Sequence, residues 1–309
     1  MKVAIYGTGG VGGYFGGRLA QAGVDVSFVA RGEHLAAMQQ QGLKVASIKG
    51  DFVIHPVQAS DNPAQIGEVD LVLVCVKGWQ LSDAVQAMKP LVGENTVILP
   101  LLNGVDAVDI LSAEFGANKV LNGLCGIFAK IMGPGLVAHM GASPWLQFGE
   151  QSNLKTARAK QVLALLESAI GLKAKLVDDV SSAVWKKFIF IASTSGVGSV
   201  SRATFGEMRD IPETKALLKG VIAETINVAK GLNIALPEDI EVYIWQKVVD
   251  STPDSDTSMQ RDILSGRPSE LHSQTGAVIR LGMKVGVETP LNEMIYAALL
   301  PQELKARNP

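Results

Sequence analysis

A chain of 309 residues and 32.7 kDa is long enough for two domains, and a hydrophobic content of 47% supplies a sizeable core. The formal net charge of −2 and the scattered lysines and arginines argue against a nucleic-acid partner. Apolar runs such as Leu71–Val76 are far shorter than the ~18 residues that suggest a membrane span, and no signal-peptide pattern opens the chain. With Cys75 and Cys125 both in apolar contexts, we expect reduced thiols, no membrane partner and a cytoplasmic location.

The first residues predict a dinucleotide-binding turn. A short buried strand, Val3–Tyr6, runs directly into Gly7-Thr8-Gly9-Gly10-Val11-Gly12, and a helical stretch to Ala22 follows. Gly7 permits the tight turn, Gly9 lets the backbone approach a pyrophosphate, and Gly12 lets the helix pack closely on the strand. A glycine-rich turn alone is weak evidence, but the flanking strand and helix agree with cofactor binding by all six residues.

The end of the second expected strand, Val26–Val29, favours NADPH over NADH. The dinucleotide fold usually has an acidic residue there, about 20 residues after the glycine turn, to hold the ribose 2′-hydroxyl. This chain has Arg31 instead, whose planar guanidinium suits a 2′-phosphate. The alternative is a solvated surface arginine, since Glu33 lies only two residues away.

Short β-branched runs alternate with helical stretches up to about residue 175, which is the pattern of a parallel sheet covered by helices. The expected strands are Val3–Tyr6, Val26–Val29, Leu71–Val76, Thr96–Leu99 and Val120–Cys125, with Leu146–Phe148 and Ala174–Val177 as later candidates. The residues from Met132 to Gly149 predict a turn and an antiparallel hairpin appended to that sheet.

Helical patterns replace the strand signals beyond Asp179. The expected helices are Ser182–Ser195, Pro212–Gly231, Pro237–Asp250, Ser269–Val285 and Pro290–Leu300. We therefore predict an α/β protein, with an N-terminal Rossmann-type dinucleotide-binding domain over residues 1–175 and an all-helical substrate and catalytic domain over residues 176–309. The active site is expected in the cleft between the halves.

Polar residues follow two of the expected strands. Lys77 comes after Leu71–Val76, where it could meet a phosphate or ribose, and Asn103 comes after the strand near Val97–Leu102, where its amide could hold the nicotinamide or a substrate oxygen. Taken alone, Lys77 would be interpreted as a snorkelling surface lysine and Asn103 as a turn residue before glycine. Their shared place at strand ends favours function.

Together these residues resemble the ketopantoate reductase (2-dehydropantoate 2-reductase) family over essentially the whole chain. The matching features are the glycine turn, Arg31, Val76-Lys77-Gly78-Trp79-Gln80, Asn103-Gly104, Trp185-Lys186-Lys187, Thr257-Ser258-Met259-Gln260-Arg261-Asp262 and Glu270. The resemblance implies NADPH-dependent reduction of a 2-keto acid to a 2-hydroxy acid, with 2-dehydropantoate and pantothenate biosynthesis as the favoured assignment.

The resemblance also implies roles for single residues. Lys187 would be the proton donor, and Glu270 would orient that lysine and the bound ligands. Ser258 would contact the substrate, Lys77 and Asn103 would touch cofactor or substrate, and backbone near Ala129 would line the cofactor site. From the residues alone Lys187 is an ordinary helical lysine, because Lys186 is equally available.

Departures from the family pattern keep other functions open. Ile191 and Ser195 stand one and two turns after Lys187, and Phe205 stands further on, where the family usually has asparagines. An isoleucine cannot replace an amide's hydrogen bonds, so Ser195 and Arg202 are candidate substrate-binding residues, with Arg202 as a substitute carboxylate anchor or else part of a surface ion pair with Glu207 or Asp210. A relative that reduces a bulkier keto acid or an imine, and a silent NADP-binding sensor, remain alternatives. No metal-ligand pattern is present, and a homodimer is left open.

Overall fold

The computed structural model describes residues 1–308, which divide into two compact units. The first unit contains Met1–Val76, Gln80–Leu102 and Ala107–Val180. The second unit begins at Ser181 and also includes two short segments from the first half of the sequence, Lys77–Trp79 and Asn103–Asp106. A single break at residue 175, as expected from the sequence, does not anticipate these two insertions.

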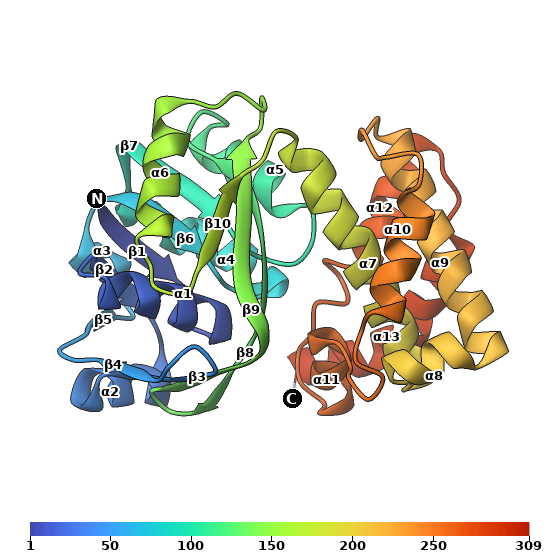
Figure 1. The fold of residues 1–309 in the computed structure, drawn as a ribbon, viewed down its shortest axis with the longest axis horizontal. Coiled ribbons are helices and arrows are strands. Elements are labelled where there is room, and N and C mark those ends of the chain that lie inside the picture. Colours follow the sequence, from blue (N-terminus) through green and yellow to red (C-terminus); the bar gives the residue numbers. More distant parts are fainter. Residues whose placement is uncertain (309) are drawn as a thin grey trace. The chain divides into compact units, whose positions relative to one another are not determined.

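The first unit is built on a parallel five-stranded sheet with the order β5-β2-β1-β6-β7. The strands are β1 (Lys2–Tyr6), β2 (Asp25–Val29), β5 (Gln58–Ser60), β6 (Val69–Val74) and β7 (Val92–Pro100) (Figure 1). The chain reverses direction across the sheet between β1 and β6, which is the switch point where this class of sheet binds ligands. The predicted Rossmann-type fold is confirmed.

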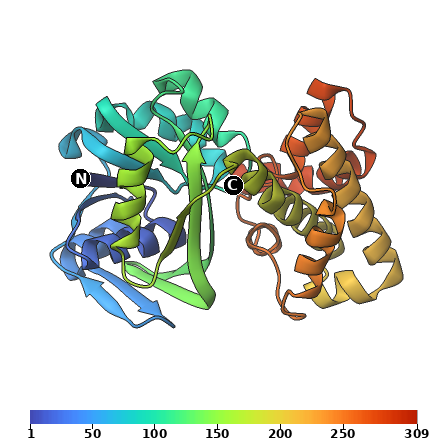
Figure 2. The ribbon, with the colours of Figure 1, turned by 45° about the horizontal axis from the view of Figure 1, so that its top comes forward.

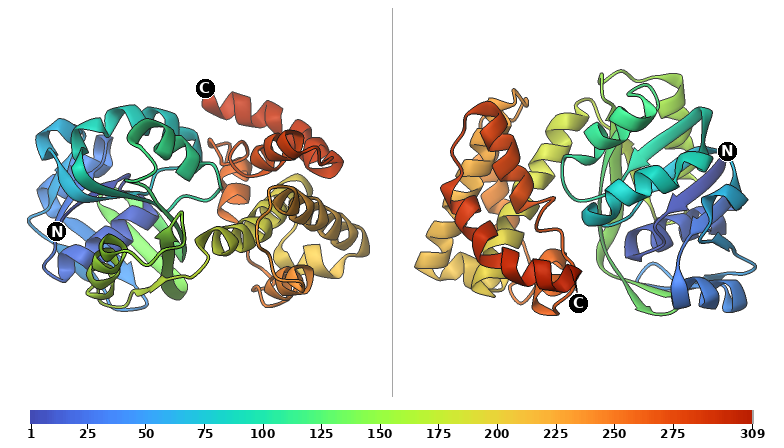
Figure 3. Two further views of the ribbon diagram at one scale, coloured as in Figure 1. Left: turned by 90° about the horizontal axis from the view of Figure 1, so that it is seen from above. Right: turned by 180° about the vertical axis from the view of Figure 1, so that it is seen from behind.

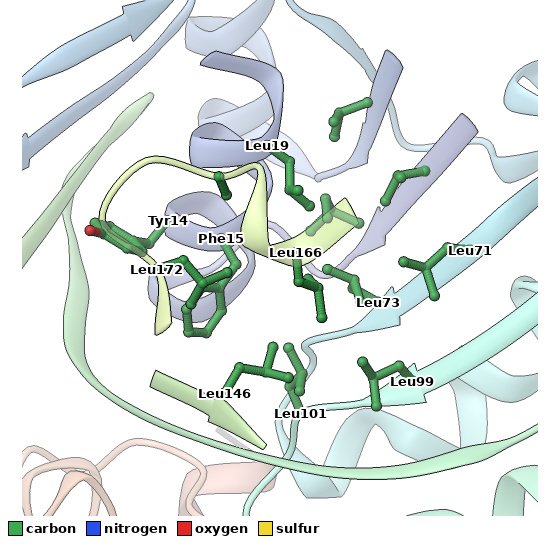
Figure 4. Close-up of a cluster of buried hydrophobic side chains, with 14 of the residues drawn as sticks. Tyr14, Phe15, Leu19, Leu71, Leu73, Leu99, Leu101, Leu146, Leu166 and Leu172 are labelled. Carbon is green, nitrogen blue, oxygen red and sulfur yellow. The ribbon is translucent and has the colours of Figure 1, made fainter. Parts of the chain in front are cut away.

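Both faces of this sheet are buried, because alternate residues of its central strands enter two different cores. Val3 and Ile5 of β1 pack with helices α1 (Gly10–Gln21) and α6 (Ala157–Glu167). Ala4 and Tyr6 face the opposite side with α4 (Leu81–Ala87) and α5 (Ala107–Phe115). Figure 4 shows the first of these cores, where Tyr14, Phe15 and Leu19 of α1 lie among leucines of both sheets of the unit.

The later expected strands belong to a second, mixed sheet, so assigning them to the parallel sheet was wrong. Its order is β10-β9-β3-β4, with β8 paired to β9. The strands are β3 (Leu43–Ser47), β4 (Phe52–Ile54), β8 (Leu121–Gly133), β9 (Leu136–Glu150) and β10 (Lys173–Leu176). The predicted antiparallel hairpin is confirmed as β8 and β9, the long green ribbon of Figure 2, which turns at Gly135 with a φ of 71°. Period alone cannot tell which of two sheets a short apolar strand joins.

Smaller helices complete the first unit. They are α2 (Gly32–Gln41), α3 (Pro63–Ile66) and the 3-10 turn Lys89–Leu91. Another 3-10 turn, Gly78–Gln80, lies where the first inserted segment returns to this unit. Helix α3 and the two 3-10 turns have only four and three residues, too few to give a periodic signal.

The second unit is helical, as predicted. Its helices are α7 (Val180–Ser201), α8 (Phe205–Asp210), α9 (Pro212–Gly231), α10 (Ile240–Val249), α11 (Ser258–Leu264), α12 (Thr275–Val285) and α13 (Pro290–Arg307). Helix α9 packs against α8, α10, α12 and α13, which Figure 3 shows in yellow to red. No helix among residues 1–308 combines the length and apolar character needed to cross a membrane.

Two helix boundaries differ from the expectation in ways that affect the site. The helix expected at Ser269–Val285 begins only at Thr275, so Glu270 lies in the turn before α12 and not in its first turn. Helix α7 continues past Ser195 to Ser201, because Gly196 and Gly198 are close-packing positions and not a stop. A Cβ at Gly198 would lie 2.5 Å from Gln260 Oε1.

Candidate active site

The glycine turn of the first unit has the geometry expected of each glycine. Gly7 adopts a φ of 98°, and a Cβ there would lie 2.8 Å from a Val76 methyl carbon. A Cβ at Gly12 would lie 2.2 Å from the Gly7 carbonyl oxygen, so the helix can approach β1 only without a side chain. A Cβ at Gly9 would meet nothing within 4 Å, so this position faces open space.

The first turn of α1 is available to an anion. Gly9 is its N-cap residue and offers no side-chain cap, and no acidic residue lies in the first turn. The first amides of a helix have no partner within the helix and favour negative charge. The open space at Gly9 and these amides fit the pyrophosphate of a dinucleotide.

Four other predicted cofactor residues lie in this turn or in neighbouring elements. Thr8 is buried, and its Oγ1 donates to the Val29 carbonyl oxygen at 2.9 Å, which fixes the turn to the end of β2. A Cβ at Gly10 would lie 2.4 Å from the Ala129 carbonyl oxygen, so α1 begins directly against β8. Arg31 is exposed at the N-cap of α2, immediately after β2. The structure therefore gathers the glycine turn and Ala129, with Arg31 at the adjacent strand end.

The second unit joins Lys187, Asn103 and Glu270 in one hydrogen-bonded relay. Lys187 Nζ, on α7, donates to Asn103 Oδ1 at 2.9 Å. Asn103 Nδ2 in turn donates to Glu270 Oε2 at 3.1 Å. Within residues 1–308 no ion pair links Lys187 directly to Glu270. The ammonium is thus oriented by a neutral amide, which leaves its remaining N–H groups for a ligand.

Glu270 is a buried carboxylate held by further donors. Glu270 is only 2% exposed to solvent. Gly78 N donates to Oε1 at 3.3 Å, and Gln274 Nε2 donates to Oε2 at 3.3 Å. A buried carboxylate costs free energy unless such donors satisfy it. The sequence did not predict Gly78 and Gln274 as members of the site.

Two glycines bring the inserted segments against the turn that holds Glu270. A Cβ at Gly78 would lie 2.4 Å from Ser273 Oγ, and a Cβ at Gly104 would lie 3.0 Å from the Ser273 carbonyl oxygen. Gly104 also adopts a φ of 113°, which disfavours any other residue. The sequence shows a glycine directly after both Lys77 and Asn103, which is a sign of close packing. That both glycines pack against Ser273 could not be inferred from it.

Lys77 is held by an acidic residue of α11. Its Nζ lies 2.9 Å from Asp262 Oδ2, and Arg267 Nη2 lies 3.1 Å from the other carboxylate oxygen. Ser258 opens the same helix one turn before Asp262, so both lie on one face of α11. The structure therefore connects the inserted Lys77 segment with the helix that carries Ser258.

The other candidate substrate residues lie apart from the relay's hydrogen bonds. Ser195 is fully buried on α7, and its hydroxyl finds no partner among the described residues. Arg202 is exposed with a φ of 60° and forms no ion pair with Glu207 or Asp210 within residues 1–308. Phe205 is 5% exposed and stacks on Phe190 at 5.9 Å, so it is a core residue and not an open pocket wall.

Comparison with known proteins gives the family. The family model described as "Ketopantoate reductase PanE/ApbA" matches residues 3–153, and the model described as "Ketopantoate reductase PanE/ApbA C terminal" matches residues 179–303. A Bacillus subtilis protein named "Uncharacterized oxidoreductase YkpB" is 29% identical over 97% of this chain and 98% of its own length. A 2-dehydropantoate 2-reductase of Mesorhizobium japonicum is 29% identical over 96% of each chain.

A solved structure agrees over the full length. The crystal structure of a PanE/ApbA family ketopantoate reductase from Ralstonia eutropha JMP134 matches with a TM-score of 0.90 and 29% identity, covering 99% of this chain and 100% of that chain. The fold, the glycine turn and these matches define an oxidoreductase that uses a nicotinamide dinucleotide. The chain belongs to the ketopantoate reductase family.

Proposed function

We propose that this protein reduces a 2-keto acid to a 2-hydroxy acid with NADPH, and that 2-dehydropantoate is its preferred substrate. The observation that supports this most is the relay from Lys187 through Asn103 to Glu270, since it presents an ammonium group that is oriented but not locked in an ion pair. The relatives named as 2-dehydropantoate 2-reductases support the choice of substrate.

The relay suits the chemistry of carbonyl reduction. When bound, the dinucleotide supplies a hydride to the carbonyl carbon of the keto acid. Negative charge then develops on the substrate oxygen, where the Lys187 ammonium stabilises it and donates a proton. Asn103 Oδ1 accepts from Nζ and fixes the direction of the lysine, while Glu270 holds the Asn103 amide through Nδ2. Glu270 thus acts on Lys187 through Asn103.

The cofactor preference rests on Arg31 and the glycine turn. The first-turn amides of α1 would hold the pyrophosphate, and the exposed guanidinium of Arg31 would hold a 2′-phosphate after β2. Lys77 and backbone near Ala129 are further proposed cofactor contacts. Lys77 would have to share its ammonium with Asp262.

Two serines are the proposed polar contacts to substrate. Ser258 lies on the face of α11 that carries Asp262, and the buried Ser195 hydroxyl has an unused donor and acceptor. Arg202 stays a proposed carboxylate anchor, because neither of its candidate acidic neighbours engages it among the described residues.

A second candidate is a relative with a more apolar keto acid or an imine as substrate. Ile191 favours it, because this residue is only partly buried one turn after Lys187 and supplies no hydrogen bond. A site built with an amide loses about 1–3 kcal/mol of binding to a polar substrate group when that amide is absent.

The proposal is tested by following NADPH oxidation at 340 nm with 2-dehydropantoate and with a panel of 2-keto acids and imines. NADH is run in parallel, and dinucleotide binding is measured separately by fluorescence. We expect turnover with NADPH in preference to NADH and highest kcat/KM for 2-dehydropantoate. Higher kcat/KM for an apolar keto acid or imine would establish the second candidate, and binding without turnover across the panel would contradict both in favour of a sensor.

A further inference from the structure

Arg280 of α12 contacts both chain segments that flank the relay. Its Nη2 donates to Asp106 Oδ2 at 2.6 Å, and Asp106 closes the inserted segment that begins with Asn103. Its Nη1 donates to the His272 carbonyl oxygen at 3.0 Å, two residues after Glu270. One planar guanidinium therefore joins the segment bearing Asn103 to the turn bearing Glu270.

Gly276, His272 and Tyr296 lie around the guanidinium of Arg280. A Cβ at Gly276 would lie 3.1 Å from Arg280 Nη1, so glycine leaves the room that the guanidinium occupies. The His272 ring nitrogens lie 3.1 and 3.4 Å from the same Nη1, and the Tyr296 hydroxyl lies 3.2 Å from Nδ1. The Arg280 side chain is 41% exposed, so its ion pair adds little to the free energy of folding.

We propose that Arg280 is a positioning residue for the reductase, which holds Asn103 and Glu270 at hydrogen-bond distance so that Lys187 stays directed at the substrate carbonyl. This inference rests on the proposed function. Its physical basis is that the Asn103 amide engages Lys187 and Glu270 at once, so a small shift of the Asn103 segment breaks one of the two bonds. Misplacement of a catalytic group by 1 Å can cost roughly a hundredfold in rate.

Arg280→Ala is the first test, with Lys155→Ala as the matched control. Lys155 forms an exposed ion pair with Asp178 in the first unit, whereas the relay residues belong to the second unit. We expect Arg280→Ala to lower kcat by roughly ten- to a hundredfold, with a smaller change in KM and an unchanged Kd for NADPH. Arg280→Lys should restore kcat only in part, because an ammonium cannot donate in the planar fork that spans Asp106 and the His272 carbonyl.

Asp106→Ala, alone and combined with Arg280→Ala, isolates the proposed contact. The double variant should be no slower than Arg280→Ala, since both remove the same link. Hydrogen exchange gives a readout that does not need turnover, and the amides of residues 103–106 and 270–274 should exchange faster in Arg280→Ala than in wild type or Lys155→Ala. Additive losses in the double variant, or unchanged kcat and exchange in Arg280→Ala, would overturn the inference.

The wild-type assay separates the two proposals. If wild-type protein fails to reduce any keto acid or imine, the proposed function fails, and unchanged exchange in Arg280→Ala would show that the link itself is absent. If wild type turns over while Arg280→Ala matches Lys155→Ala in kcat, the positioning role alone is wrong. A fall in the melting temperature with kcat unchanged at 25 °C would also reject it in favour of a purely structural ion pair.

Discussion

At the scale of single residues, the unexpected feature is that an amide separates the lysine from the carboxylate. The family resemblance implied that Glu270 orients Lys187, while Asn103 was expected to hold the nicotinamide or a substrate oxygen. In the structure, Asn103 Oδ1 accepts a hydrogen bond from Lys187, and Asn103 Nδ2 donates one to Glu270. Such a role depends on two contacts that are distant in sequence, so no local pattern could predict it.

The surroundings of His272 predict that the stability of the fold depends on pH. Partial desolvation of the ring lowers the pKa of His272, and the charges of Arg280 and Arg307 lower it further, against Asp106 and Glu303. A folded pKa below the ordinary value of about 6.5 means that the unfolded chain takes up the proton first. This contribution to the free energy of unfolding is complete above about pH 6.5 and is lost as the pH falls below it.

We therefore predict that His272→Gln loses less stability than wild type between pH 7.5 and pH 5. Urea unfolding at both pH values measures the change in the free energy of unfolding. Glutamine is chosen because its side-chain amide oxygen can still accept a hydrogen bond from Arg280. His34→Gln is a useful comparison, because burial also lowers the pKa of His34. An acid-induced loss in His272→Gln equal to that of wild type would show that this ring does not titrate differently in the folded state.

At the scale of elements, glycines decide how helices and strands approach one another. The glycine turn was predictable, because its spacing, strand and helix all lie within one local segment. The glycines of α7 were not, since a helix-interior glycine reads as a stop until its close neighbour is known. The same limit applied to the start of α12, where Ser269 N bonds to both oxygens of the buried Glu303 and the helix begins later.

Gly9 and Gly12 should respond differently to the same substitution. Gly12→Ala should lower the free energy of unfolding by about 1–3 kcal/mol, because its Cβ would collide with the Gly7 carbonyl. Gly9→Ala should leave stability within about 0.5 kcal/mol, because its Cβ meets open space.

Dinucleotide binding provides the second half of this prediction. Gly9→Ala should raise the Kd for NADPH roughly tenfold or more, which corresponds to ~1.4 kcal/mol, because the added methyl group occupies the space assigned to the pyrophosphate. A fluorescence titration with NADPH measures this Kd, and urea unfolding measures the stability of both variants. Unchanged NADPH affinity in a fully folded Gly9→Ala protein would move the pyrophosphate away from this turn.

At the scale of the whole molecule, the sequence predicted the order of the two folds but not how the chain is shared between them. The change from strand to helix period near residue 175 is close to the break after Val180. Lys77–Trp79 and Asn103–Asp106 nevertheless belong to the helical unit. Because Asn103 is in one of these segments, the relay is complete within the second unit, although one of its three members comes from the first half of the sequence.

The catalytic assignment is tested most directly by comparing Lys187→Ala with Lys186→Ala on the best substrate of the panel. The two lysines are neighbours on α7, but the hydrogen bond to Asn103 comes from Lys187. We predict that Lys187→Ala lowers kcat by about 10²–10⁴ with NADPH affinity unchanged, while Lys186→Ala stays close to wild type. Equal losses in the two variants, or a Lys187→Ala protein that retains wild-type kcat, would contradict the role of the relay in the reduction.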